Sequence, residues 1–237
     1  MQKIIDYNRK NPARQVNRVR FAGYYSEPLL VPNTVLPAMQ KLQEAGIEFG
    51  LITNGVPLVD KVRQVVVHAK YVHISIDAQN DQVHQELKGA RVGEYERILN
   101  NIRALLALRA ELKTKVDVNV GYILHHQNVD GIIDFVRQVK AIGVSLVRFK
   151  MNLYDDSKQK LTDAEHAQAY ANIAEAKRLF QDKSFQVVAI HDFEESQEIP
   201  TPDCSQCFYM NFAGVVASDS QAYMCDHTVK QPNKSLG

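Results

Sequence analysis

Three cysteines near the end of the chain are the residues best suited to binding a metal. Cys204 and Cys207 form a Cys-x2-Cys pair, and Cys225 follows, with His227 two residues later. Thiolates and imidazoles bind structural zinc, and thiolates hold iron–sulfur clusters. An odd number of cysteines without a signal sequence is a poor basis for disulfides. The sequence therefore predicts metal binding and leaves an iron–sulfur cluster, a zinc ion and unligated thiols as alternatives.

Polar side chains also follow three apolar runs that are typical of strands. Glu27 comes after the first run, Asn54 after the second, and Ser75 and Asp77 end the third. Because the carboxyl ends of parallel strands meet at one edge of a sheet, these groups are placed to face a common ligand. Carboxylates accept hydrogen bonds from an ammonium group or from ribose hydroxyls. The structural alternatives are capping by Glu27 and Asp77, an Asx turn at Asn54 and a buried Ser75.

Two further pairs of polar residues lie at the later strands. His125 and His126 are adjacent; on an extended chain they point to opposite faces, which disfavours a shared metal and leaves His125 as a candidate substrate contact. Arg148 and Lys150 are two residues apart, so they share one face of their strand. If that face looks into a barrel, the two cations can bind an anionic substrate; if it looks outward, they are solvated charges.

The elements that position these residues alternate between short apolar runs and longer helical patterns. Strands are expected at 19–22, 49–53, 71–76, 116–124, 144–149 and 185–190, and helices at 34–45, 57–67, 93–112, 129–141 and 162–180. Such alternation implies right-handed βαβ crossovers and a parallel sheet. This number of units favours an α/β fold of the partial-barrel kind over its rival, a doubly wound sheet. Residues 1–17 contain no strand, so the pattern starts in mid-repeat.

Composition limits the classes of function. The chain has 237 residues and a net charge of +1, so it shows no basic footprint for nucleic acid. No window approaches about 20 apolar residues, and residues 1–30 lack a signal core, so we expect a cytoplasmic protein without a membrane partner. The acidic, proline-containing stretch 192–202 is typical of a linker. It separates an expected core domain, 1–191, from a C-terminal segment, 192–237, in which residues 217–221 indicate a hairpin.

Five segments in order resemble motifs of the radical S-adenosylmethionine (SAM) superfamily. They are Tyr25-Ser26-Glu27-Pro28-Leu29-Leu30, Thr53-Asn54-Gly55 and Ser75-Ile76-Asp77-Ala78, followed by residues 120–132 and 143–147. The resemblance runs from residue 17 to the end of the chain. It implies a partial (β/α)6 TIM-like barrel that lacks its first strand, followed by the start of a small C-terminal auxiliary Fe–S domain.

The resemblance also implies roles for individual residues. The segment that ends at Glu27 would bind the amino group of SAM through its backbone and its carboxylate. The polar residues after the third strand would face the ribose or the carboxylate of SAM. Lys88 occupies the place of a family segment that often bears arginine, and it would contact an anion. The SAM-binding residues that the resemblance implies are Tyr25, Ser26, Glu27, Asn54, Ser75 and Asp77.

The cysteines both support the resemblance and depart from it. Cys204, Cys207 and Cys225 resemble the start of the auxiliary-cluster domain (SPASM or twitch type), in which they would bind an auxiliary iron–sulfur cluster. The Cys-x3-Cys-x2-Cys loop that binds the family's primary [4Fe–4S] cluster is missing, since no cysteine precedes residue 204. The expected explanation is a chain cut at both ends, with Met1 an internal or misassigned start, and inactive by itself. A cluster-free relative is the competing explanation.

The resemblance implies that the full-length protein is an enzyme. This enzyme would cleave SAM reductively and abstract hydrogen from a peptide, a protein or a small-molecule substrate. Its electrons would come from a donor such as flavodoxin or ferredoxin. Two other classes stay open. One is a non-radical (β/α) barrel enzyme, and the other is a cluster-free binding protein with a C-terminal zinc site.

Overall fold

The computed structural model describes residues 1–23, 26–151, 161–190, 214–217 and 221–223. The chain divides into two compact units, Met1–Asp192 and Phe193–Gly237. No described helix is long and apolar enough to cross a membrane. Tyr25 and the predicted metal ligands Cys204, Cys207 and Cys225 lie outside the described residues. The assignment of residues 192–237 to the start of an auxiliary domain therefore stays a prediction.

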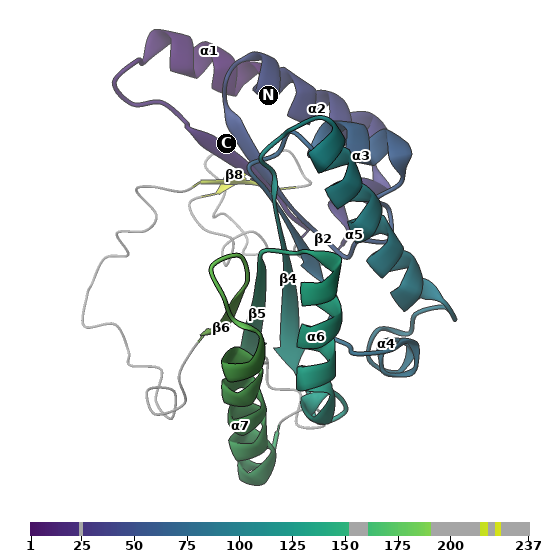
Figure 1. Cartoon of the computed structure of the whole chain (residues 1–237). Coiled ribbons are helices and arrows are strands. Elements are labelled where there is room, and N and C mark those ends of the chain that lie inside the picture. The colour runs from purple at the N-terminus through teal and green to yellow at the C-terminus, as the bar shows by residue number, and fades with distance from the viewer. Residues whose placement is uncertain (24–25, 152–160, 191–213, 218–220, 224–237) are drawn as a thin grey trace, which may run out of the picture. The chain divides into compact units, whose positions relative to one another are not determined.

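One sheet of six parallel strands forms the centre of the larger unit (Figure 1). The strands are β1 (Arg18–Phe21), β2 (Glu48–Thr53), β3 (Tyr71–Ser75), β4 (Asp117–Leu124), β5 (Leu146–Met151) and β6 (Gln186–Ile190). Each strand pairs with the next strand in the chain. A doubly wound sheet reverses its strand order at a switch point, whereas a (β/α) barrel does not. The predicted partial barrel is confirmed, and its sheet is open.

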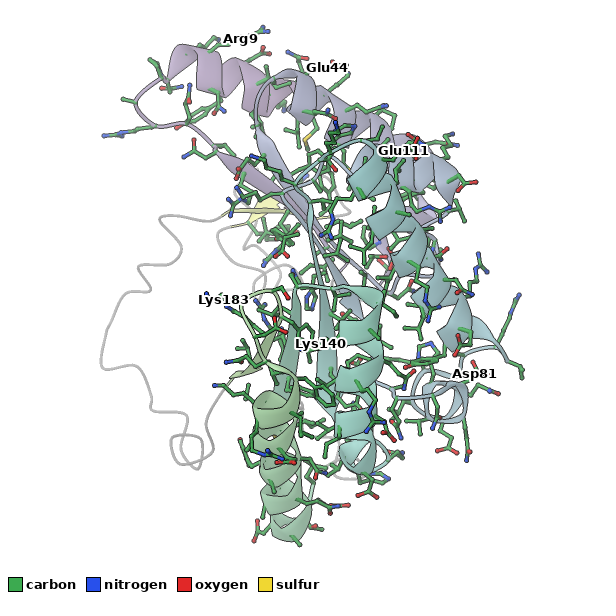
Figure 2. The ribbon with its side chains drawn as sticks, viewed as in Figure 1. Arg9, Glu44, Asp81, Glu111, Lys140 and Lys183 are labelled. Carbon is green, nitrogen blue, oxygen red and sulfur yellow. The ribbon has the colours of Figure 1, made fainter. Side chains whose placement is uncertain are left out.

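Helices alternate with the strands along the chain. They are α1 (Gln2–Lys10), α2 (Pro32–Glu44), α3 (Asp60–Val66), α4 (Asp81–Lys88), α5 (Glu94–Glu111), α6 (Ile132–Ile142) and α7 (Asp163–Phe180), with 3₁₀ helices η1 (Pro28–Leu30) and η2 (Val129–Gly131). Figure 1 shows α3, α5 and α6 along one side of the sheet. Charged residues such as Glu44 and Glu111 extend from the outer helices into solvent (Figure 2).

Helix α4 is not among the helices expected from the sequence. It has eight residues, of which only Val83 and His84 are buried, so no apolar period marks it. Its ends are set by capping instead. The Asn80 side chain accepts a hydrogen bond from the Val83 N–H, and Gly89 ends the helix with a left-handed φ of 62°. Local cap chemistry thus defines a helix that hydrophobic patterning misses.

The two faces of the sheet differ because side chains alternate along each strand. One face is apolar and packs with α5 and α6 into the core. This core includes Leu51, Val72, Ile74, Val118, Val120, Tyr122, Val147 and Phe149, together with Ile98, Ile102, Phe135 and Val139. The opposite face, called the open face below, is largely polar. Its alternating positions carry Arg20, His73, Ser75, Asn119, Gly121, Arg148 and Lys150.

The smaller unit contains a short antiparallel hairpin, formed by β7 (Val215–Val216) and β8 (Ala222–Tyr223). The Ala217 N–H donates a hydrogen bond of 3.0 Å to the Gln221 carbonyl oxygen and closes the turn. The hairpin predicted around residues 217–221 is therefore confirmed.

Candidate functional site

The carboxylate of Glu27 joins the ends of β1 and β2. Its Oε1 accepts hydrogen bonds from the Thr53 hydroxyl (2.9 Å) and the Leu29 N–H (3.1 Å). Its Oε2 accepts one from the Asn54 N–H (2.7 Å). Glu27 is also the N-cap of η1, so the capping role considered from the sequence is present. Because a carboxylate offers about four lone-pair sites, Oε2 can accept a further donor.

Gly23 lies very close to the backbone of Ser26. A Cβ at Gly23 would lie 1.5 Å from the Ser26 carbonyl oxygen, so the loop after β1 requires glycine at this position. Ser26 is exposed beside Glu27. A serine and a carboxylate therefore follow one another directly at the carboxyl edge of β1.

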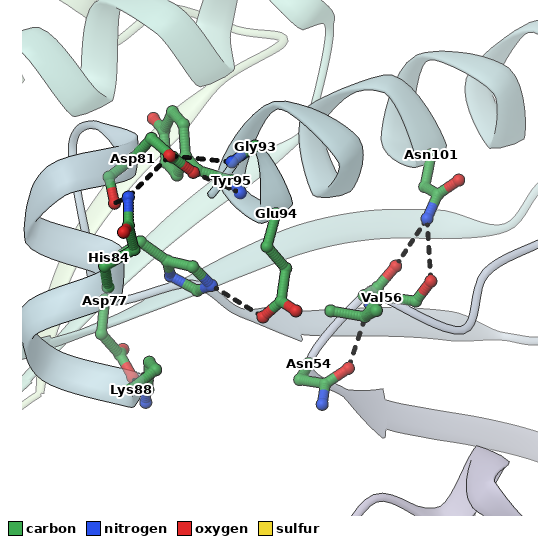
Figure 3. Close-up of polar contacts among 12 residues, drawn as sticks. Asn54, Val56, Asp77, Asp81, His84, Lys88, Gly93, Glu94, Tyr95 and Asn101 are labelled. Carbon is green, nitrogen blue, oxygen red and sulfur yellow. Dashed lines mark hydrogen bonds and ion pairs between the residues drawn. The ribbon is translucent and has the colours of Figure 1, made fainter. Parts of the chain in front are cut away.

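The loop after β2 presents Asn54 to solvent. The Asn54 Oδ1 accepts a hydrogen bond of 3.0 Å from the Val56 N–H, which is the Asx turn considered from the sequence. Asn101 on α5 fixes the loop by donating to the carbonyl oxygens of Gly55 (2.9 Å) and Val56 (3.2 Å) (Figure 3). Among the described residues, the Asn54 side-chain nitrogen has no hydrogen-bond partner. This nitrogen is a free donor next to Glu27.

Asp77 is held in the interior just after β3. It is 1% exposed and adopts a positive φ of 60°. Its Oδ1 accepts a hydrogen bond of 2.7 Å from the Ile123 N–H, and its Oδ2 lies 2.5 Å from the Lys88 ammonium nitrogen. The capping alternative for Asp77 is wrong, because Asn80 caps the following helix. Asp77 instead connects the ends of β3, β4 and α4.

Ser75, two residues earlier, differs from Asp77 in having an uncommitted side chain. It is half-buried on the open face and pairs in register with Gly121 of β4. No described residue forms a hydrogen bond with its hydroxyl. Ser75 therefore offers both a donor and an acceptor to a ligand.

Lys88 reaches Asp77 from the last turn of α4, and its side chain stays 40% exposed. Asp81 anchors the start of the same helix by accepting hydrogen bonds from the backbone N–H groups of Gly93 (2.8 Å) and Tyr95 (3.2 Å) (Figure 3). Both hydrogen bonds lower the pKa of the Asp81 carboxyl, and the bond from Gly93 has the larger effect. We predicted that Lys88 contacts an anion, and within the chain this anion is the Asp77 carboxylate.

The turn after β4 is organised by Asn128, which is fully buried. Its Nδ2 donates to the carbonyl oxygens of Asp77 (2.9 Å) and Ile123 (2.8 Å), and its Oδ1 accepts from the His125 N–H (2.8 Å). The His125 Nδ1 is buried without a hydrogen-bond partner in the described part of the chain, and burial lowers the pKa of this imidazole. His126 is exposed.

His73 and Asn119 form a buried pair on the open face that sequence reasoning missed. The His73 Nδ1 and the Asn119 Oδ1 are 2.6 Å apart. The Asn119 Nδ2 donates to Asp117, which orients the amide and makes Nδ1 of His73 the donor. Burial lowers the pKa of His73, and the charges of Arg148 and Lys150 add to this effect. His73 is therefore a neutral imidazole whose Nε2 is an acceptor.

Arg148 and Lys150 lie on the open face, which is the inward alternative considered from the sequence. Gly121 of β4 is the register partner of Arg148. Burial lowers the pKa of Lys150, and the positive charges of Arg148 and Arg20 lower it further. Arg20 was not singled out from the sequence, although an arginine between Val19 and Phe21 of a strand was a signal. Both arginines thus act on Lys150 across the open face.

Comparison with known proteins supports the fold. No family model and no curated protein matches the sequence. SuiB of Streptococcus suis bound to S-adenosylmethionine matches with a TM-score of 0.70 and 13% identity, over 100% of this chain and 55% of SuiB. The enzyme anSMEcpe with bound AdoMet and the Kp18Cys peptide matches with a TM-score of 0.64 and 18% identity, over 100% of this chain and 68% of anSMEcpe.

A third match is a domain of the pyruvate-formate lyase-activating enzyme of Bacteroides vulgatus ATCC 8482. Its TM-score is 0.52 at 17% identity, over 71% of this chain and 97% of that domain. The chain therefore spans little more than half the length of SuiB and nearly all of the smaller domain. At these identities the matches establish a common fold. That fold is the α/β partial barrel that the sequence predicted.

Proposed function

We propose that this chain is the SAM-binding barrel core of a radical SAM enzyme. The observation that carries the proposal is the convergence of Glu27, Asn54 and Ser75 at the carboxyl edges of β1, β2 and β3, which are neighbours in the sheet. Ligands of parallel α/β folds bind at this edge. SuiB and anSMEcpe, which share the fold, have been solved with SAM bound.

The groups at this edge fit the chemistry of SAM. The open acceptor site on Glu27 Oε2 suits the amino group, while the Asn54 amide and the Ser75 hydroxyl suit a carboxylate or ribose hydroxyls. The proposed set also includes Tyr25, Ser26 and Asp77. Because both Asp77 oxygens already bind Ile123 and Lys88, Asp77 contributes mainly by holding the β3 and β4 ends in place.

The chemistry of the whole protein is part of the proposal. SAM bound together with a reduced [4Fe–4S] cluster supplies radical chemistry that abstracts hydrogen from a substrate. The printed sequence contains no Cys-x3-Cys-x2-Cys, so ligands for this primary cluster are not among its residues. We propose that Cys204, Cys207 and Cys225 bind an auxiliary iron–sulfur cluster. The substrate is a peptide, a protein or a small molecule, and the electron donor is a flavodoxin or a ferredoxin.

Binding of SAM to the 237-residue chain tests the core of this proposal. Isothermal titration calorimetry with SAM should show a single site. Glu27→Gln removes the negative charge that receives the amino group, and Ser75→Ala removes the free hydroxyl, so each should weaken binding. Glu44→Gln, on the exposed side of α2, is the matched control and should leave the affinity unchanged (Figure 2). No binding, or equal binding by Glu27→Gln and the unaltered chain, would overturn the proposal.

The metal at the C-terminus is tested separately. Anaerobic reconstitution with iron and sulfide should give a brown protein whose iron content falls when Cys204 and Cys207 are replaced by Ala. A colourless protein that retains only zinc would contradict the iron–sulfur proposal and favour the zinc-site alternative.

A further inference from the structure

We infer that the open face binds carboxylates of the substrate through Arg148 and Lys150 on β5, with Arg20 on β1 adding positive charge. This inference rests on the proposed function, because it names the substrate class of the same site. Its cations lie on β5 and β1 and are separate from the proposed SAM-binding set, whereas the neighbouring Ser75 belongs to that set.

Arg148 lies beside a position that has no side chain. Its partner Gly121 also pairs with Ser75, so Ser75, Gly121 and Arg148 form a row across three strands. The ring of His73 leans over the glycine, because a Cβ at Gly121 would lie only 2.6 Å from the His73 Nε2. A guanidinium and a hydroxyl therefore flank a floor formed by a glycine and a neutral imidazole. Such a row combines cationic and neutral polar contacts for a ligand.

Three cations of this face lack ion pairs: none of Arg20, Arg148 and Lys150 forms one with a described residue. Asp77 acts on Lys150 electrostatically, but its two oxygens already bind the Lys88 ammonium group and the Ile123 N–H. The Arg148 Nε is buried without a hydrogen-bond partner among the same residues. Buried polar groups are normally hydrogen-bonded, so this nitrogen is a candidate donor to a ligand.

A carboxylate is the acceptor that fits best. The guanidinium of arginine presents Nε and Nη as a planar fork that matches the two carboxylate oxygens. Lys150 follows two residues later, about 7 Å along the same strand, which suits a second carboxylate of the same substrate. SuiB has been solved with its precursor peptide SuiA and anSMEcpe with the Kp18Cys peptide. An acidic peptide is therefore the first probe.

Fluorescence anisotropy of a fluorescein-labelled hexaglutamate peptide provides the test, with labelled hexalysine as the opposite-charge control. The 237-residue chain should bind hexaglutamate and not hexalysine, and added salt should weaken the binding. Arg148→Gln and Lys150→Gln should each weaken it about tenfold, since each removes one charge-assisted contact. Arg97→Gln and Lys41→Gln remove exposed cations from the outer helices α5 and α2 and should change little. Circular dichroism confirms that each variant folds.

The possible outcomes separate this inference from the proposed function. SAM affinity of Lys150→Gln and Arg148→Gln, measured by calorimetry, should equal that of the unaltered chain. If it falls as far as peptide affinity does, the cations serve SAM and the inference is wrong. Equal loss in the Arg97→Gln control, or no hexaglutamate binding, also overturns it. Citrate that displaces the peptide at low concentration identifies a small acid as the source of the carboxylates, whereas weak displacement identifies a peptide.

Discussion

Replacement of the Asp77 side chain should reveal how the carboxyl edge of the sheet is held together. Asp77→Ala removes the acceptor of the Ile123 N–H and the partner of Lys88 in one step. An unsatisfied backbone donor costs about 1–3 kcal/mol. The ion pair adds less, about 0–1 kcal/mol, because the Lys88 side chain is 40% exposed and screened by water.

The backbone at Asp77 adds a further contribution. Its φ of 60° lies in the left-handed region, which Asp tolerates better than Ala does. Ala at such a position costs about 1 kcal/mol more. Taken together, Asp77→Ala should lower the free energy of unfolding by about 3 kcal/mol. Asp77→Asn keeps an oxygen for the Ile123 N–H and tolerates the same φ, so it should cost about 1 kcal/mol.

Equilibrium unfolding in urea, followed by circular dichroism, measures these differences. Asp6→Ala is a suitable control, because the Asp6 side chain is 49% exposed on α1 and takes part only in a surface ion pair with Arg9 and an exposed hydrogen bond from Gln2. The control should stay within about 0.5 kcal/mol of the unaltered chain. If Asp77→Asn costs as much as Asp77→Ala, the negative charge and not the hydrogen bond holds the edge. If Asp77→Ala costs less than the control, Asp77 does not connect the strand ends and the reasoning fails.

Three further predictions concern the open face and the reaction. Gly121→Ala should lower the free energy of unfolding in urea by about 1–3 kcal/mol, because the new Cβ would clash with the His73 ring. An unchanged free energy of unfolding would show that the His73 ring can move aside without cost. Burial lowers the pKa of His73 below its ordinary value of 6.5, so below that pH the unfolded chain binds a proton more readily than the folded chain does. Unfolding free energy should therefore decline as the pH falls below 6.5, and His73→Gln should flatten that decline, whereas an equal slope in the variant would contradict the role given to burial. The 237-residue chain with dithionite and SAM should release no 5′-deoxyadenosine by chromatography, since it lacks the Cys-x3-Cys-x2-Cys ligands; any release above the protein-free blank would contradict this expectation.

The strands and most helices of the larger unit were predictable because their signals are local. β3 and β4 carry apolar residues at alternating positions, and α5 has a long apolar stripe, so the βα alternation is visible in the sequence. Alternation also predicted that Arg148 and Lys150 share a face. It did not decide which face, because that depends on where the neighbouring helices pack.

The contacts at the candidate site were not predictable, since they join residues far apart in the chain. Thr53 bonds to Glu27 across 26 residues, and Asn128 bonds to Asp77 across 51. No spacing rule connects such pairs before the strand register is known. His73 could have been noticed as a polar residue inside an apolar strand, but its partner Asn119 is found only by pairing β3 with β4.

The two carboxylates of the candidate site are used differently from the polar groups around them. Glu27 accepts hydrogen bonds from three donors of the chain, and Asp77 binds two. Most acceptor sites of both carboxylates are therefore used to hold the loops at the strand ends. The groups left free in the described part of the site include the neutral Asn54 amide and Ser75 hydroxyl, and the cations of the open face. The carboxylates at this edge already have partners, whereas the cations beside them have none among the described residues. Such an edge attracts negatively charged ligands. The arrangement therefore supports the proposal of an acidic substrate over a basic one, and the hexaglutamate and hexalysine titrations distinguish the two directly.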